Sequence, residues 1–179
     1  MNEEAISIRG PRGELRGMRH RPAEPDGGWT AVVLQGFFSS THVGPARLYV
    51  QIGRILASRG VEVVRMDCFG VGDSDGDFEN TTYESQLEDY RAIMEGAGGR
   101  RIVLVGHSLG SSMAIRLAVE PPIVERLVLI SPSCGPSSHP EKLFSADQRT
   151  ELEARGETWR KSVLVRKAFF DAMESEDIY

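Results

Sequence analysis

The sequence predicts an α/β fold in which helices cover both faces of a mostly parallel β-sheet. Four short apolar runs, at residues 31–34, 61–67, 102–105 and 126–130, have the length and β-branched content of buried strands. Helical segments separate these runs, and strands that alternate with helices form parallel sheets with right-handed crossovers. The length of 179 residues fits one domain.

The first element is an antiparallel hairpin at one edge of the predicted sheet. Residues 5–8 and 14–18 alternate apolar and polar side chains, and the sequence Gly-Pro-Arg-Gly at 10–13 supplies the turn. A polar loop rich in proline and glycine follows at 22–28 and leads to the first buried strand. The loop after that strand, residues 35–44, lies at its carboxyl end.

A helix is expected between Pro45 and Gly60. Proline is favoured in the first turn of a helix, and glycine is favoured just after its end. Four apolar residues fall on one face of this segment, namely Leu48, Ile52, Ile55 and Leu56. This face predicts a helix that packs on the sheet.

The next crossover combines a long loop with a second helix. Residues 68–76 are rich in glycine and aspartate, and the sequence Thr-Thr-Tyr-Glu at 81–84 is a capping box that opens a helix. The side chains expected to face inward are those of Leu87, Tyr90, Ile93 and Met94. The glycines at 96, 98 and 99 predict the end of this helix.

The pattern G-x-S-x-G follows the strand at 102–105 and precedes a helix-compatible run at 111–118. This order of strand, turn and helix is the context that a nucleophile elbow requires. Gly106 and Gly110 provide the space, and Ser108 is expected to adopt a strained backbone conformation. His107 directly precedes Ser108, and in so tight a turn the preceding side chain is expected to point away from the serine hydroxyl. We therefore predict that His107 is a packing or hydrogen-bonding residue rather than a base.

Composition excludes several classes of function. The net charge of −5 gives no basic surface for nucleic acid. No run has the length of a membrane span, and the first residues lack a signal-peptide pattern. Two cysteines are too few for a disulfide framework, so we expect reduced thiols and a cytoplasmic protein.

Three stretches together resemble the α/β-hydrolase superfamily, and its cinnamoyl (feruloyl) esterase and serine-aminopeptidase-like branch in particular. They are residues 72–80, 86–89 and 105–110. The resemblance runs from Ile6 to about Ser133. It implies a core domain at 1–136 and a helical lid segment at 137–179.

The resemblance assigns a role to each residue of the elbow region. Ser108 is implied as the nucleophile that attacks a small acyl ester, thioester or amide, and no cofactor is implied. The backbone N–H groups of Phe37 and Leu109 are implied as the oxyanion hole, which stabilises charge that develops in the transition state. The family's His-Gly motif reads Gln35-Gly36 here, which keeps the backbone donor but changes the side chain that braces the loop.

Four aromatic residues are candidates for the substrate pocket, namely Phe38, Phe69, Trp159 and Phe170. After a helix capped at Ser145, a second helix is expected to carry Trp159, Val163, Phe170 and Met173 on one face. Such a face either packs on a core or covers an acyl pocket as a lid. The position after a strand at the site edge favours the lid.

The acid and the histidine of a hydrolase triad follow the serine in the chain. His139 is the one histidine after Ser108, and its loop context indicates a surface residue. The resemblance therefore implies an incomplete fold, whose acid and base come from residues or a chain not present here. Strand 127–130 would be an unpaired apolar edge, which favours a complementing second chain or a homo-oligomer. A non-catalytic subunit that binds a partner or an acyl ligand is the alternative.

Other sites are disfavoured by their spacing. The four histidines show no metal-ligand spacing. After Gly70-Val71-Gly72 the third glycine of a dinucleotide loop is misplaced, and no helix opens at once. The carboxylates from Asp73 onward mimic a calcium loop, but Phe78 stands where that loop needs glycine. Cys68 has no elbow and is expected to be a small buried thiol. We therefore predict no metal.

Overall fold

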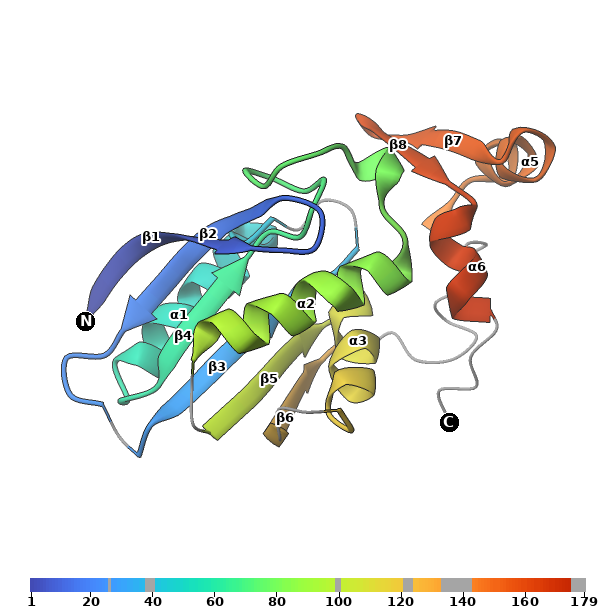
Figure 1. The fold of residues 1–179 in the computed structure, drawn as a ribbon. Helices are drawn as coiled ribbons and strands as arrows, with labels where there is room; N and C mark the ends of the chain where they lie inside the picture. Colours follow the sequence, from blue (N-terminus) through green and yellow to red (C-terminus); the bar gives the residue numbers. More distant parts are fainter. Residues whose placement is uncertain (26, 38–40, 99–100, 121–123, 133–142, 175–179) are drawn as a thin grey trace.

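Strand β3 (Trp29–Leu34) lies near the centre of a six-stranded sheet (Figure 1). The structure is a computed structural model, and it describes residues 1–25, 27–37, 41–98, 101–120, 124–132 and 143–174. The strand order is β1-β2-β4-β3-β5-β6. The other strands of this sheet are β1 (Asn2–Arg9), β2 (Glu14–Arg21), β4 (Glu62–Met66), β5 (Arg101–His107) and β6 (Val124–Ile130).

The sheet is parallel except at the edge formed by the first two strands. β3 pairs in parallel with β4 and β5, and β5 pairs in parallel with β6. The predicted hairpin is present, because β1 and β2 pair antiparallel and β2 continues antiparallel onto β4. The predicted fold class is therefore confirmed.

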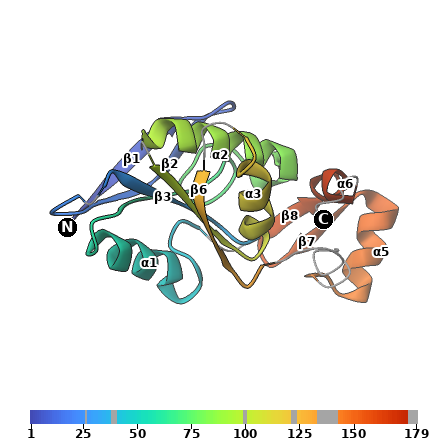
Figure 2. The same ribbon diagram turned by 90° about the horizontal axis from the view of Figure 1, so that it is seen from below.

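Helices cover both faces of the sheet, as predicted. Figure 2 shows α1 (Leu48–Ala57) on one face and α2 (Tyr83–Ala97) with α3 (Leu109–Leu117) on the other. Successive β3 side chains alternate between two cores: Ala31 and Val33 join the α1 side, whereas Val32 and Leu34 join the α2–α3 side. Full burial of a valine or leucine side chain stabilises a fold by about 1.5–3 kcal/mol. This explains the continuous apolar run in the sequence.

Two helix starts lie further along the chain than expected. Pro45 opens a 3₁₀ turn, η1 (Pro45–Arg47), and α1 begins only at Leu48, because Ala46 and Arg47 have positive φ values of 48° and 63°. The capping box of α2 is formed by Thr82 and Ser85 rather than by Thr81 and Glu84. The local sequence fits a capping box at either position, and the observed helix start is one residue later than the predicted start.

The segment after β6 contains a hairpin that the sequence analysis did not predict. It consists of α5 (Ala146–Arg155), β7 (Glu157–Arg160), β8 (Val163–Arg166) and α6 (Ala168–Glu174). The capped start at Ser145 is confirmed. The single helix through Trp159 and Val163 is wrong: Trp159 lies on β7 and Val163 on β8, and these two strands pair antiparallel around a turn at Lys161, where φ is 53°. Thr158 and Val165 are the buried residues of these two strands, and they are partners in the pair.

β6 forms the other edge of the sheet, and its apolar side chains are exposed. Leu127, Val128 and Leu129 expose 40%, 46% and 38% of their surface. Among the described residues, β5 is the one strand that pairs with β6. The predicted apolar edge strand is therefore present.

No described helix has both the length and the apolar character needed to cross a membrane.

Candidate active site

Ser108 occupies a sharp turn between β5 and α3. Its φ of 53° and ψ of −122° lie outside the regions that non-glycine residues prefer, as predicted for an elbow. Its N–H donates to the carbonyl oxygen of Ile130 at 3.0 Å, which ties the turn to β6. The residue is also the N-cap of α3, where free N–H groups favour negative charge.

The two elbow glycines are required by close approaches of the backbone. A Cβ on Gly106 would lie 2.5 Å from the carbonyl oxygen of Gly110. A Cβ on Gly110 would lie 2.4 Å from the carbonyl oxygen of Leu34. Both distances are far below van der Waals contact, so α3 can start this close to β3 and β5 only with glycine at both positions.

The loop after β3 touches the elbow through Gly36. A Cβ on Gly36 would lie 3.3 Å from the Cβ of Ser108 and 3.1 Å from Nδ1 of His107. Phe37 follows Gly36 on this loop, and Leu109 follows Ser108 as the first residue of α3. The loop that carries Phe37, one proposed oxyanion donor, is therefore packed directly on Ser108, which precedes the other proposed donor, Leu109.

Two tyrosine hydroxyls and one glutamine hold this loop in place. The N–H of Gln35 donates to Tyr90 Oη and the N–H of Gly36 donates to Tyr49 Oη, each at 2.9 Å. The Gln35 side chain donates to the carbonyl oxygen of Met66 and, at 3.1 Å, to Oδ1 of Asp67. Gln35 therefore braces the loop from its buried position, even though the sequence departs here from the family's His-Gly motif.

His107 hydrogen-bonds away from the proposed nucleophile. Its Nδ1 lies 2.9 Å from Tyr49 Oη, and burial lowers the pKa of its imidazole. The prediction that His107 is a hydrogen-bonding residue is confirmed.

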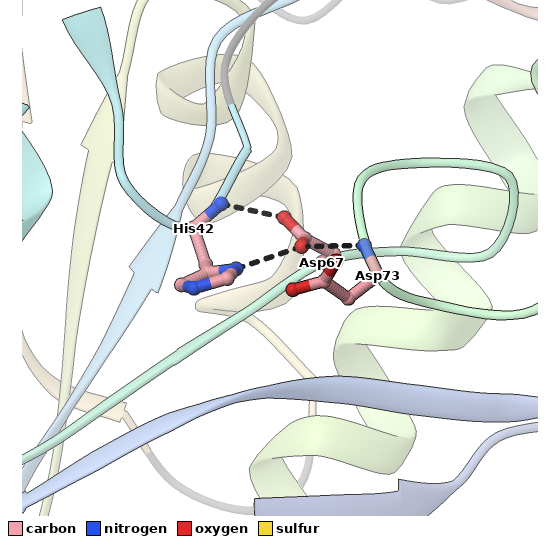
Figure 3. Close-up of side chains that lie close together, drawn as sticks. All are labelled: His42, Asp67 and Asp73. Carbon is pink, nitrogen blue, oxygen red and sulfur yellow. Dashed lines mark hydrogen bonds and ion pairs between the residues drawn. The ribbon is translucent and has the colours of Figure 1, made fainter. Parts of the chain in front are cut away.

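A second set of polar side chains lies at the carboxyl ends of β3 and β4 (Figure 3). The buried carboxylate of Asp67 accepts the backbone N–H of His42 at 2.5 Å and its ring Nδ1–H at 2.7 Å. The backbone N–H of Asp73 donates to the same carboxylate at 3.2 Å. Asp67 thereby connects the loop after β3 with the loop after β4.

His42, Asp67 and Asp73 also offer three metal-ligand atoms within 4.8 Å of one another. Both carboxylate oxygens of Asp67 already accept hydrogen bonds from His42, and Gln35 adds a further one. This arrangement satisfies the buried charge from within the protein. Its evident role is to hold the two loops together.

Aromatic side chains from the last segment cover the loop after β3. The ring centroid of Phe37 lies 4.6 Å from that of Phe169 and 5.4 Å from that of Phe170. Phe78 completes the group, at 5.9 Å from Phe37 and 5.6 Å from Phe169. Phe169 and Phe170 are 1% and 3% exposed, so α6 is anchored here by its apolar side.

Of the other predicted pocket residues, the structure describes Trp159 and Phe69. Trp159 is 62% exposed on β7, because residues 157–160 form a strand rather than a helix. The ring of Phe69 lies under the guanidinium of Arg12, at 4.4 Å, and against Gly13 and Gly76. Phe38 and His139 lie outside the described residues.

Cys68 is a buried thiol, as predicted. Its exposure is 2%, and burial raises the pKa of the thiol well above its ordinary value. A neutral, enclosed thiol is a poor nucleophile.

Sequence reasoning missed the roles of Tyr49, Tyr90, His42 and Asp67. Tyr90 was predicted to face inward, but only as an apolar residue. One signal for Asp67 was its place at the end of a buried strand, because parallel strands bring their carboxyl ends to one edge. The partners themselves are distant in the sequence and could not be paired by pattern.

Comparison with known proteins points to one family. Residues 27–179 match the model of the alpha/beta hydrolase family. The chain is 30% identical over 126 residues to the sn-1-specific diacylglycerol lipase ABHD11 of Mus musculus, which covers 68% of this chain. The matched region spans 39% of the length of that lipase.

Solved structures share the fold. A lidless alpha/beta serine hydrolase of Xanthomonas campestris is 26% identical, with a TM-score of 0.63 over 76% of this chain and 64% of its own. The ferulic acid complex of Est1E from Butyrivibrio proteoclasticus is 22% identical, with a TM-score of 0.76 over 97% of this chain and 72% of its own.

Proposed function

The chain belongs to the alpha/beta hydrolase family, and on that premise we propose that it cleaves a carboxylic ester through an acyl-enzyme on Ser108. The observation that carries the proposal is the strained conformation of Ser108 at a turn packed against Gly36. Such strain is retained where a side chain must be presented to a ligand. Thioesters and amides share the same carbonyl chemistry.

The proposed reaction uses two backbone donors, one from the loop after β3 and one from the start of α3. The Ser108 hydroxyl oxygen bonds to the carbonyl carbon while its proton passes to a base. The N–H groups of Phe37 and Leu109 stabilise the oxyanion, and each such donor contributes about 3–4 kcal/mol to the transition state. The C–O bond of the leaving alcohol then breaks with return of the proton, and water releases the acid from Ser108.

The base is proposed to come from polypeptide outside the described residues. Each of the three histidines that the structure describes is bound to another side chain: His20 to Arg65, His42 to Asp67 and His107 to Tyr49. β6 adjoins the elbow strand and exposes apolar side chains. We infer that further polypeptide, in the same or a second chain, extends the sheet from β6 and brings a histidine and an acid to Ser108.

The aromatic group around Phe37 supports an apolar acyl site. Phe37 is only partly buried, and α6 places Phe169 and Phe170 on it. We propose that α6 and the β7–β8 hairpin form a lid beside Ser108 and that the acyl group contacts the Phe37 side of this lid. The mouse relative is a diacylglycerol lipase by name, which is consistent with an apolar acyl chain.

A fluorophosphonate probe tests the assignment, because it forms a covalent bond with activated serines. The chain is labelled in an extract of the cells that produce it, where any complementing polypeptide is present. We expect label on the peptide that contains Ser108, no label on Ser108→Ala, and unchanged label on Ser58→Ala, an exposed serine that caps the C-terminal end of α1. Label that survives Ser108→Ala overturns the assignment, and absence of any label favours a non-catalytic binding role.

A further inference from the structure

We propose that Tyr49 is a positioning residue whose hydroxyl joins the oxyanion loop to the nucleophile elbow through neutral His107. The inference rests on the proposed role of Ser108. It concerns a residue of α1, on the opposite side of the sheet from α3.

The hydroxyl of Tyr49 contacts both the loop after β3 and the elbow strand. It accepts the N–H of Gly36 at 2.9 Å and lies 2.9 Å from Nδ1 of His107. Gly36 directly precedes Phe37, and His107 directly precedes Ser108. One buried atom therefore fixes the residue before an oxyanion donor and the residue before the nucleophile.

The ring of Tyr49 is itself locked in place. Its exposure is 0%, and its ring meets the ring of His107 edge-on with centroids 5.8 Å apart. A Cβ on Gly44 would lie 2.6 Å from the Tyr49 ring, and Gly44 has a φ of 75°. The side chain of any residue other than glycine at position 44 would therefore clash with the Tyr49 ring.

We assign the hydrogen-bond chain a direction from its protons. Gly36 N–H is a donor, so Tyr49 Oη accepts there, and its own proton is available for Nδ1 of His107. That requires the Nε2–H tautomer of a neutral imidazole. Burial lowers the pKa of His107 and so favours the neutral form. The chain then runs from Gly36 N–H through Tyr49 O–H to His107 Nδ1.

Tyr90 provides a matched control within the same loop. Its hydroxyl accepts the N–H of Gln35 at 2.9 Å, one residue before Gly36, and its side chain is 2% exposed. It hydrogen-bonds to Cys68 rather than to the elbow. Tyr90→Phe therefore removes one loop acceptor, as Tyr49→Phe does, but leaves the link to His107 intact.

The expected effect follows from the cost of misplacing a donor. Loss of one oxyanion donor lowers kcat by about 10²–10³-fold. Tyr49→Phe keeps the donor but frees its loop, so we expect Ser108 phosphonylation to slow by about 10-fold or more relative to Tyr90→Phe. His107→Leu removes the acceptor at the other end of the chain and should slow phosphonylation similarly, which provides a second variant if Tyr49→Phe fails to fold.

Nitrogen-15 NMR of His107 gives a readout that a purely structural role would not change. We expect wild-type protein and Tyr90→Phe to show the Nε2–H tautomer, and Tyr49→Phe to show a mixture of tautomers. An unchanged tautomer in Tyr49→Phe, or equal slowing in the two tyrosine variants, overturns the inference. If Ser108 of the wild-type protein is not labelled although His107 shows the Nε2–H tautomer, the proposed function is overturned. The positioning role of Tyr49 is then overturned as well, because it rests on that function.

Discussion

The carboxylate of Asp67 holds His42 at two points, accepting its backbone N–H at 2.5 Å and its ring Nδ1–H at 2.7 Å. The side chain of Asp67 is fully buried and that of His42 is 13% exposed. Through this pair the loop after β3 is anchored to the end of β4, beside the segment that carries Gly36 and Phe37.

Asp67→Asn should lower the free energy of unfolding by about 2–3 kcal/mol, measured by urea unfolding. The reason is that an amide offers one acceptor oxygen where the carboxylate oxygens now serve several donors, and bonds to charged groups contribute about 1.5–3 kcal/mol. Asp73→Asn is the control, because Asp73 joins the cluster through its backbone N–H, which the substitution keeps. Equal losses in the two variants would contradict the role of Asp67.

Gly110→Ala should destabilise the chain by about 3 kcal/mol, because overpacking a close contact costs about 1–3 kcal/mol and backbone atoms cannot move aside easily. The new Cβ would meet two carbonyl oxygens, of Leu34 at 2.4 Å and of Gln35 at 2.5 Å. Gly98→Ala is the matched control: nothing lies within 4 Å there, and its φ of 71° costs about 1–2 kcal/mol. A smaller loss for Gly110→Ala than for Gly98→Ala would refute the close approach.

Stability should fall as the pH drops below about 6.5, the usual pKa of histidine. Burial lowers the pKa of His20, which accepts from Arg65 at 2.7 Å, and burial also lowers the pKa of His107. The unfolded chain then binds more protons than the folded chain, so acid favours unfolding. Carboxylates with lowered pKa values, such as Glu120, add their loss only at lower pH.

Urea unfolding between pH 7.5 and pH 5 measures this dependence. His20→Gln should flatten the slope in this range while leaving the contribution of His107. A slope that is the same with and without His20 would contradict its assignment as a buried neutral imidazole.

The edge strand β6 should cause the isolated chain to self-associate. Unpaired strand edges with exposed apolar side chains pair readily, and a charge placed on the edge prevents this. Val128→Lys should therefore reduce association, measured by light scattering on a size-exclusion column. Ile55→Lys is the control, because Ile55 is a similarly exposed apolar residue, at 52%, but lies on α1. Equal effects would indicate general solubility rather than edge pairing.

The isolated chain should turn over p-nitrophenyl acetate far more slowly than a complete esterase. A serine hydroxyl without an adjacent base is a poor nucleophile near neutral pH. Binding and the oxyanion hole alone leave about 10³–10⁴-fold acceleration over water in well-studied triad enzymes. Full esterase turnover by the isolated chain would contradict this and would assign the base to His20, His42 or His139.

Much of the fold follows from local pattern. The buried runs of β3, β4, β5 and β6 and the elbow at Ser108 are recognisable because each depends on a few consecutive residues. The hairpin of β7 and β8 was missed because Trp159 and Val163 also fit a helical spacing in so short a stretch. There the pairing of Thr158 with Val165 outweighed helical periodicity.

The sequence by itself determined the order of strands and helices as far as β6, the strained turn at Ser108 and the glycines that permit it, because backbone geometry and hydrophobic period act over neighbouring residues. Only the tertiary structure decided that Tyr49 meets Gly36 and His107, and that His42 meets Asp67. Those contacts form when a parallel sheet brings the carboxyl ends of separate strands together and α1 packs beside them, and the positions involved lie 13–58 residues apart. Hydrogen bonds of that kind depend on ångström-scale placement, which residue spacing along a chain does not encode.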